Sequence, residues 1–253
     1  MKTIHPKIVL VGAGPGDPEL LTVKGLKALK EARVIVYDAL VDPRLLQEAP
    51  RAQHVFVGKR KGIKALEQHE INALLVQKSL VYGNVVRLKG GDSFVFGRGW
   101  EELEYAAQRG VDVEVVPGIS SSISVPALAG VPVTHRQLAT GFHVLTGTLS
   151  DGSFNTDIAQ AATLNSTLVV LMGLNQVDKI VAAYKAAGKY DQAIAIISKG
   201  SWEEQTKIVG EIHSIEALVS KHKPQAPAIV VIGDVVRLED ALIQKQVEKA
   251  LLN

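Results

Sequence analysis

Short runs of β-branched residues alternate with helical patterns along almost the whole chain, and this alternation is what most constrains the fold. The strand-like runs of the first half are "KIVLVG", "ARVIVYD", "HVFVG", "NVVRLKG" and "VDVEVVPG". Those of the second half are "GFHVLTG", "STLVVLMG", "QAIAIISKG", "TKIVGEI" and "APAIVVIG". Nearly continuous apolar runs are typical of strands that are buried on both faces of a mostly parallel sheet. The sequence therefore predicts an α/β protein with mostly parallel sheets.

The helical patterns and a break in the alternation predict two domains. Helices are expected at 22–32, 69–78, 100–110, 176–189 and about 238–252, from apolar residues at helical spacing. Residues 134–141, "THRQLATG", interrupt the rhythm. A chain of 253 residues is long enough for two compact units. We therefore expect one α/β domain over 1–136 and a second over 137–253.

Composition excludes several classes of function. The chain has no cysteine, so it has no disulfides or thiolate metal sites, and its seven histidines show no paired ligand spacing. We predict no metal site. A net charge of +2 and 5% aromatic residues, not interleaved with basic ones, do not indicate a nucleic-acid surface. No run approaches the ~18 apolar residues of a membrane span, and the apolar run near the start is too short for a signal peptide. We expect a soluble cytoplasmic protein.

The stretch "IVLVGAGPGDPELLT" at residues 8–22 resembles a dinucleotide-binding turn but departs from it at one position. A strand, Gly12-x-Gly14 and an acidic residue at the end of the next strand match that pattern. The third glycine of the pattern falls at residue 17, which is Asp. Asp17 followed by Pro18 instead predicts an N-cap and the first residue of a helical turn. A carboxylate there would also repel a pyrophosphate, which argues against a nicotinamide cofactor.

Other strand-like runs also end in loops of small residues. "RLKGGDSFVFGRG" contains Gly90 and Gly91, "VVPGISSS" carries Gly118 before three serines, and "LMGLNQ" and "SKGS" stand at the ends of two runs of the second half. Ligands of open parallel sheets bind outside the carboxyl ends of the strands. Each loop alone is a weak signal, because many such turns contain glycine for turn geometry alone. Together they predict one pocket in which main-chain groups contact the ligand.

This combination of stretches resembles the tetrapyrrole methylase family of S-adenosylmethionine-dependent methyltransferases. The matching stretches are "VGAGPGDPELLT", "VYDALV", "VFVGKR", "RLKGGDSFVFGRG", "VVPGIS", "GVPVTHR", "LMGLNQ" and "APAIVVIG", which run from residue 11 to 233. "RLKGGD…FGRG" followed by "THR" is most similar to members that methylate uroporphyrinogen III twice at carbon, giving precorrin-2 for sirohaem or cobalamin. Two residues depart from the family pattern: Ser93 stands where proline is usual and Trp100 where glycine is common. A serine at 93 is expected to leave the loop less rigid.

The resemblance implies roles for the residues at matching positions. S-adenosylmethionine would lie folded in a cleft between the domains and leave as S-adenosylhomocysteine. The residues implied to contact it are Pro15, Gly90, Gly91, Asp92, Val95, Ser120, Ser121, Met172, Gly200 and Ala228. Asp38 and Lys59 resemble the family's proton acceptor and donor. Arg98, Glu101 and Arg136 resemble its substrate-side residues, and arginine forks match carboxylates.

Alternatives remain open from the residues alone. A strand-end Asp38 is as commonly a solvated or capping carboxylate, and Met172 is as readily a core methionine. A later precorrin methyltransferase would share the fold and the cofactor. A nicotinamide-dependent oxidoreductase and a non-catalytic binder of S-adenosylmethionine or a tetrapyrrole are more remote. The resemblance also implies a homodimer.

Overall fold

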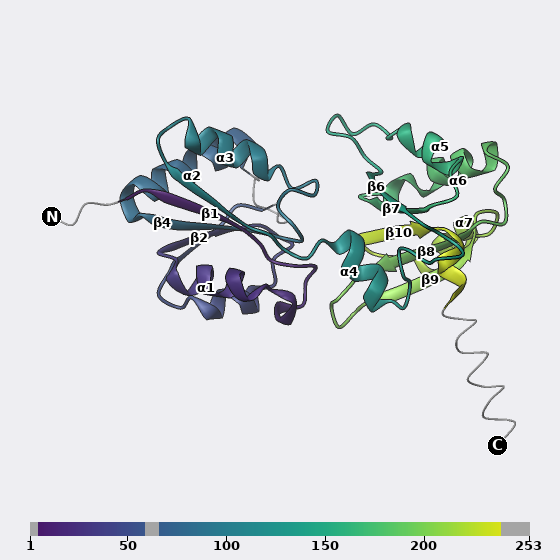
Figure 1. Cartoon of the computed structure of the whole chain (residues 1–253), viewed down its shortest axis with the longest axis horizontal. Coiled ribbons are helices and arrows are strands. Elements are labelled where there is room, and N and C mark those ends of the chain that lie inside the picture. Colours follow the sequence, from purple (N-terminus) through teal and green to yellow (C-terminus); the bar gives the residue numbers. More distant parts are fainter. Residues whose placement is uncertain (1–4, 59–65, 239–253) are drawn as a thin grey trace, which may run out of the picture. The chain divides into compact units, whose positions relative to one another are not determined.

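The computed structural model describes residues 5–58 and 66–238, in two compact units, Met1–Ser120 and Ser121–Asn253 (Figure 1). The division falls earlier in the chain than the boundary expected at 136/137. The reason is packing: Val125, Ala129 and Val131, which follow the division, belong to an apolar cluster of the second unit. The segment 134–141 is a turn of that unit, closed by main-chain hydrogen bonds between His135 and Ala139 of 2.8 and 2.9 Å.

The first unit is a parallel sheet with helices on both faces, as the alternating pattern predicts. The strands lie in the order β3-β2-β4-β1-β5, and every pairing is parallel. Their bounds are β1 Lys7–Gly12, β2 Val34–Tyr37, β3 Gln53–Phe56, β4 Asn84–Lys89 and β5 Asp112–Val116. All five strands expected for this half are confirmed. Parallel pairing brings their carboxyl ends to one edge of the sheet, where the glycine loops begin.

Helices cover the two faces of this sheet and bury its apolar side chains. The helical segments are η1 Pro18–Leu20, α1 Val23–Glu31, η2 Pro43–Glu48, α2 Gln68–Tyr82 and α3 Gly99–Ala107. One apolar cluster joins α1 and η2 to the sheet, and another joins α2 and α3 to it. Figure 1 shows α1 on one side of the sheet and α2 and α3 on the other. This layered arrangement leaves the strand ends for the loops.

The second unit contains a mixed sheet, which differs from the expectation of a mostly parallel one. Its order is β6-β7-β10-β8-β9, and only the pair of β6 and β7 is parallel. The bounds are β6 Phe142–Thr146, β7 Thr167–Leu171, β8 Ala193–Ser198, β9 Thr206–Glu211 and β10 Ala228–Ile232. A short connection at 199–205 joins β8 to β9 as antiparallel neighbours, as short loops require. The five strand positions are confirmed, but their directions are not those of a parallel sheet.

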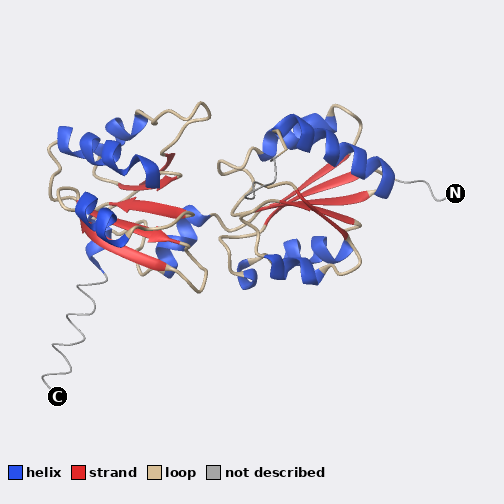
Figure 2. Ribbon diagram, turned by 180° about the vertical axis from the view of Figure 1, so that it is seen from behind, coloured by secondary structure: helices blue, strands red, loops and turns tan. Residues whose placement is uncertain are grey.

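Helices again lie on both faces of the second sheet (Figure 2). They are α4 Ser121–Leu128, α5 Asp157–Ala162, η3 Leu174–Gln176, α6 Val177–Ala186, α7 Ile215–His222 and η4 Asp234–Arg237. The expected stripe of α6 is buried, with Ile180 and Val181 at the core. The helix expected at 238–252 lies outside the described residues except for Leu238. Within 5–58 and 66–238, no helix combines the length and the apolar character needed to cross a membrane.

Candidate active site

Three glycine loops of the first unit meet at the carboxyl edge of its sheet. Gly12 ends β1, Gly91 follows β4 and Gly118 follows β5. Gly14 and Gly91 form a two-way main-chain bridge, with N···O distances of 3.2 and 2.7 Å. A Cβ atom on Gly118 would lie 2.3 Å from the Gly91 carbonyl oxygen and 2.6 Å from the Gly12 Cα atom. Only glycine allows this approach, so the floor of the site is main chain.

The side chain of Asp92 holds two of these loops together. Its Oδ2 atom accepts a hydrogen bond from the Gly118 main-chain N–H at 2.9 Å, and its Oδ1 atom accepts one from the Phe94 N–H at 2.8 Å. Hydrogen bonds to a charged acceptor are among the stronger ones in proteins. Each carboxylate oxygen therefore already braces a loop, and the structure assigns Asp92 a positioning role beside any contact with a cofactor.

The first loop has the capped turn that argues against a dinucleotide site. The Asp17 side chain accepts a hydrogen bond from the Glu19 N–H at 2.9 Å, and Pro18 begins the 3-10 turn η1. The predicted N-cap is confirmed. Pro15 lies between Gly14, which is bridged to the second loop, and Gly16. Pro15, Gly90 and Gly91, which the resemblance implies to contact the cofactor, therefore lie close together in the structure.

The loop that connects β4 to α3 is strained and tightly folded. Phe96 and Arg98 adopt the left-handed backbone region, with φ of 53° and 58°. Ser93 is buried, and its carbonyl oxygen accepts a hydrogen bond from the Gly99 N–H at 3.1 Å. Left-handed residues other than glycine cost about 1–3 kcal/mol each and concentrate at functional sites. Val95, half-buried, lies in this loop.

A buried cluster of charges lies beneath this loop, and the sequence did not predict it. Glu102, on α3, is 1% exposed, and its Oε1 atom is 3.2 Å from Arg87 Nε and 2.9 Å from Lys89 Nζ. Gln68 donates to the same oxygen at 3.1 Å. Burial, and then the charge of Arg87, lower the pKa of Lys89, while Glu102 opposes this shift. Two cations inside the apolar run "NVVRLKG" were the available signal, because buried charges need a partner.

Asp38 lies at the end of β2 within reach of the same cluster. Its Oδ2 atom is 3.6 Å from the Arg87 Nη2 atom, and its side chain is 26% exposed. Its Oδ1 atom accepts a hydrogen bond from the Leu40 N–H at 3.2 Å. The carboxylate is thus held between a buried cation and the main chain, at the edge where the glycine loops meet, and part of it faces solvent.

Arg98 and Glu101 pair with each other at the start of α3. The Arg98 Nε and Nη2 atoms donate to the two carboxylate oxygens of Glu101 at 2.8 and 2.6 Å. These hydrogen bonds raise the pKa of Arg98 and lower that of Glu101. Both side chains are exposed, which leaves the guanidinium available to a ligand. Arg136 is exposed on the second unit, and Lys59 lies outside the described residues.

The residues expected from the second unit gather at one edge of its sheet. Met172 directly follows β7, Gly200 follows β8, and Ala228 begins β10. The strand pairing brings these ends together, since Ala228 is the partner of Ser198 at the end of β8, and the next residue of β10 is the partner of Leu171. A Cβ atom on Gly200 would lie 2.2 Å from the Val125 Cγ1 atom. The long-range pairing thus brings three separated motifs to one place.

The second set of loops shows the same backbone strain as the first. Met172, Lys199 and Ser201 have φ of 54°, 48° and 69°. Of the non-glycine residues with positive φ in the described ranges, all but Lys223 lie in the loops of the two expected sets. Met172 is 53% exposed, so it is not a core methionine. Ser120 and Ser121 directly follow the third glycine loop, one on each side of the division between the units.

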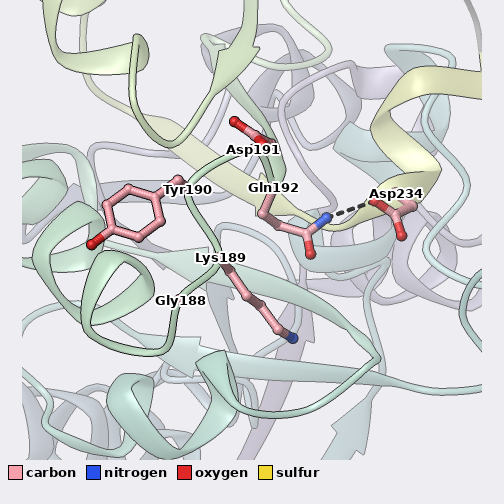
Figure 3. Close-up of a pocket in the computed structure, with 6 residues that line it drawn as sticks. All are labelled: Gly188, Lys189, Tyr190, Asp191, Gln192 and Asp234. Carbon is pink, nitrogen blue, oxygen red and sulfur yellow. Dashed lines mark hydrogen bonds between the residues drawn. The ribbon is translucent and has the colours of Figure 1, made fainter.

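A pocket at the other edge of the second sheet is lined by none of the residues of these loops; its lining is Gly188, Lys189, Tyr190, Asp191, Gln192 and Asp234 (Figure 3). Gln192 comes just before β8 and Asp234 just after β10, and the Gln192 Nε2 atom donates to Asp234 Oδ1 at 2.8 Å. One of the lining residues, Asp191, forms with Glu211 and His213 the one group within the described ranges that has the spacing of metal ligands. Asp191 is almost fully exposed there, and Arg237 already pairs with Glu211 at 3.0 Å. The candidate active site does not include this pocket.

Comparison with known proteins decides the family. The model of the tetrapyrrole (corrin/porphyrin) methylases matches residues 7–216. The chain belongs to this family. A uroporphyrinogen-III C-methyltransferase of Methanocaldococcus jannaschii is 43% identical over 238 residues, which are 93% of this chain and 98% of that protein. An S-adenosyl-L-methionine-dependent uroporphyrinogen III methyltransferase of Methanosarcina barkeri is 43% identical over 244 residues, 94% of this chain and 95% of that one.

Longer relatives and solved structures agree with this family. A siroheme synthase of Acinetobacter baylyi is 41% identical over 93% of this chain but only 52% of its own length, so the chain spans about half of that protein. The uroporphyrin-III C-methyl transferase from Thermus thermophilus, complexed with S-adenyl homocysteine, has a TM-score of 0.79 at 39% identity. That match covers 92% of this chain and 99% of the other. The tetrapyrrole methylase fold is therefore that of both units described here.

Proposed function

We propose that this tetrapyrrole methylase transfers two methyl groups from S-adenosylmethionine to carbon atoms of uroporphyrinogen III, giving precorrin-2. The observation that carries the proposal is the meeting of three glycine loops at one sheet edge in a chain whose relatives, matched over nearly their full length, are uroporphyrinogen-III methyltransferases. The product, precorrin-2, is common to the routes that lead to sirohaem and to cobalamin.

The residues of each unit fit a folded S-adenosyl cofactor. Gly12, Gly91 and Gly118 form a glycine cradle in which main chain packs directly on main chain, since a Cβ atom on Gly12 would lie 2.5 Å from the Gly118 Cα atom and one on Gly118 would lie 2.3 Å from the Gly91 carbonyl oxygen. Main-chain groups, rather than side chains, therefore face a ligand at this edge of the sheet. In the second unit, Gly200 is required by the side chain of Val125, and the exposed Met172 offers a soft apolar surface to an adenine ring. The proposed contacts of Pro15, Gly90, Asp92, Val95, Ser120, Ser121 and Ala228 belong to the same two loop sets.

Methyl transfer requires little covalent chemistry from the protein itself. A bound S-adenosylmethionine supplies a methyl group that is already electrophilic. The protein must hold the nucleophilic pyrrole carbon in line with it, which is catalysis by proximity and orientation. Carbon methylation leaves a proton to remove, and Asp38 is the proposed acceptor because its partly exposed carboxylate is fixed at the edge of the cradle. Lys59 is the proposed proton donor.

The substrate's carboxylates are proposed to be bound by arginine side chains. Uroporphyrinogen carries a ring of carboxylates, and a guanidinium fork matches such a group in two hydrogen bonds. Arg98 is exposed and oriented by Glu101 through its own two hydrogen bonds. Arg136 is proposed to bind a further carboxylate. Before the substrate binds, Glu101 sets the orientation of the Arg98 guanidinium. A substrate carboxylate that binds the same nitrogen atoms would compete with Glu101 for them.

The first test is calorimetric titration with S-adenosylhomocysteine and with NAD, followed by an anaerobic assay with uroporphyrinogen III. Binding of S-adenosylhomocysteine but not NAD, with two methyl groups transferred, is the expected result. Binding of S-adenosylhomocysteine without methyl transfer would indicate that the substrate is a later precorrin. Binding of NAD alone would refute methyl transfer as the reaction. A cobalt precorrin-4 methyltransferase shares the fold at 24% identity, which supports the fold alone.

A variant separates substrate binding from cofactor binding. Arg136→Ala is expected to raise KM for uroporphyrinogen III at least tenfold while the affinity for S-adenosylhomocysteine stays within twofold. The matched control is the exposed neighbour Gln137→Ala, which should leave both values unchanged. If Arg136→Ala abolishes S-adenosylhomocysteine binding, Arg136 does not belong to the substrate side.

The oligomeric state and the cellular compartment are also part of the proposal. We propose a homodimer in the cytoplasm, on the strength of the resemblance that also implied the cofactor. Light scattering during size-exclusion chromatography measures the assembly directly, and a monomer mass at micromolar concentration would contradict the dimer. Fractionation of the native host would test the compartment.

A further inference from the structure

The loop between β4 and α3 and the first turn of α3 hold large aromatic side chains out into solvent. Phe94, Phe96 and Trp100 are 51%, 46% and 66% exposed. The rings of Phe94 and Trp100 meet edge to face, with centroids 6.5 Å apart. Single exposed apolar residues are ordinary, but large apolar side chains gathered on one short stretch of surface are typical of a binding site. We call Phe94, Phe96 and Trp100 the aromatic rim.

The loop is built so that these rings stay exposed. Gly97 and Gly99 are packed so closely on Ser93 that a Cβ atom on either would lie 2.6 Å from its carbonyl oxygen. Ser93, the small residue, points inward and is 1% exposed, while its aromatic neighbour Phe94 faces outward. Phe96 keeps a left-handed backbone. A braced and strained loop cannot readily fold its aromatic side chains into the core, so their exposure is a fixed property of the native state.

The surroundings of the rim point to an anionic ligand that carries flat aromatic rings. Arg98 lies in the chain between Phe96 and Trp100, and its exposed guanidinium, which Glu101 holds through two hydrogen bonds, is the cation beside the rings. The loop begins at Asp92, which ties it to the glycine cradle. A ligand with an apolar ring face and carboxylates at its periphery satisfies both the rings and the cation.

We infer that the aromatic rim, and Trp100 above all, packs against the pyrrole rings of the tetrapyrrole substrate and determines its affinity. The inference rests on the proposed function, since it takes uroporphyrinogen III as the ligand. Aromatic side chains prefer offset or edge-to-face contacts with other rings, and Trp100 already makes such a contact with Phe94. The rim thereby acts as a specificity element for the macrocycle, beside the arginines that bind its carboxylates.

The chain offers a direct optical test, because it contains only two tryptophans, Trp100 and Trp202. The Trp202 indole N–H is buried without a hydrogen-bond partner, so Trp202→Phe removes no bond and leaves Trp100 as the sole indole. Acrylamide should quench Trp100 emission efficiently in the free protein. Anaerobic uroporphyrinogen III, added with S-adenosylhomocysteine so that no turnover occurs, should lower the quenching constant at least threefold.

The controls separate the occupants of the rim. Protection by S-adenosylhomocysteine alone would assign the rim to the cofactor, and protection that grows with protein concentration without ligand would assign it to a second copy. Either result overturns the inference. If calorimetry shows that uroporphyrinogen III binds while Trp100 stays equally quenchable, the inference fails and the proposed function stands. If uroporphyrinogen III does not bind, both fail.

Kinetics provide the second readout. Trp100→Ala should raise KM for uroporphyrinogen III about tenfold with kcat and S-adenosylhomocysteine affinity within twofold, and Trp100→Phe should restore KM to within about twofold. The control is Tyr82→Ala, which removes an exposed ring at the end of α2, outside the loop, and should change none of these values. Equal KM values in Trp100→Ala and the unaltered protein would overturn the inference.

Discussion

Replacing Gly118 with alanine tests whether the cradle of the site depends on contact between main chains. A Cβ atom there would lie 2.3 Å from the Gly91 carbonyl oxygen, and ordinary contact begins at 3.4 Å, so the loops must separate by about 1.1 Å. The same movement would stretch the hydrogen bond from Gly118 to Asp92, now 2.9 Å, to about 4 Å, beyond hydrogen-bond range.

The magnitude follows from these two effects. Overpacking costs about 1–3 kcal/mol, and a lost hydrogen bond to a charged group costs about 1.5–3 kcal/mol. We expect Gly118→Ala to lower the free energy of unfolding by about 3 kcal/mol. The affinity for S-adenosylhomocysteine should fall at least tenfold, because the cradle loses its spacing. Urea unfolding measures the first quantity and calorimetric titration measures the second.

A matched glycine makes the result decisive. A Cβ atom on Gly141 would meet no atom within 4 Å, and its backbone does not have a positive φ, so Gly141→Ala should leave both quantities nearly unchanged. The reasoning is refuted if Gly118→Ala unfolds at the same urea concentration as the unaltered protein and binds S-adenosylhomocysteine as tightly. Lost binding with unchanged stability would show that the loops separate without cost.

Three further perturbations test the charges and polar groups around the site. Glu102→Gln removes the carboxylate that pairs with both Lys89 and Arg87, leaving only Asp38 beside Arg87, and should cost about 3 kcal/mol in urea unfolding. The exposed Glu101→Gln should cost less than about 1 kcal/mol, and equal effects would contradict the buried cluster. Ser93→Ala removes a buried hydroxyl without a hydrogen-bond partner, so stability should stay equal or rise by up to about 1 kcal/mol, and a loss above 1 kcal/mol would show a hidden partner. Hydrogen bonds from two lysines lower the pKa of Glu114 from 4.5 to about 2, so its stabilisation is complete above pH 4.5 and is lost as the pH falls through 2. Between pH 4.5 and 2, the free energy of unfolding of Glu114→Gln should therefore decrease less than that of the unaltered protein.

The sequence named candidate residues for the site, but it did not predict the contacts that hold these residues in place. Asp92 was expected only from the family resemblance, and the structure adds that it braces Gly118 and Phe94. For Ser93 the sequence predicted only a less rigid loop, and the structure adds that the residue is buried and that its carbonyl oxygen accepts a hydrogen bond from Gly99. Such roles depend on which main-chain groups come within reach, and no local pattern of side chains carries that information.

The sequence by itself determined the elements that depend on near neighbours. Strand positions follow from apolar runs, and the turn after Asp17 follows from a capping side chain and a proline, which act within a few residues. Only the tertiary structure decided the strand directions of the second sheet, the position of the division between the units, and the pairing of Arg87 with Glu102. Those features join residues far apart in the chain. Their free energy comes from pairing and burial, which exist only once the whole unit has folded.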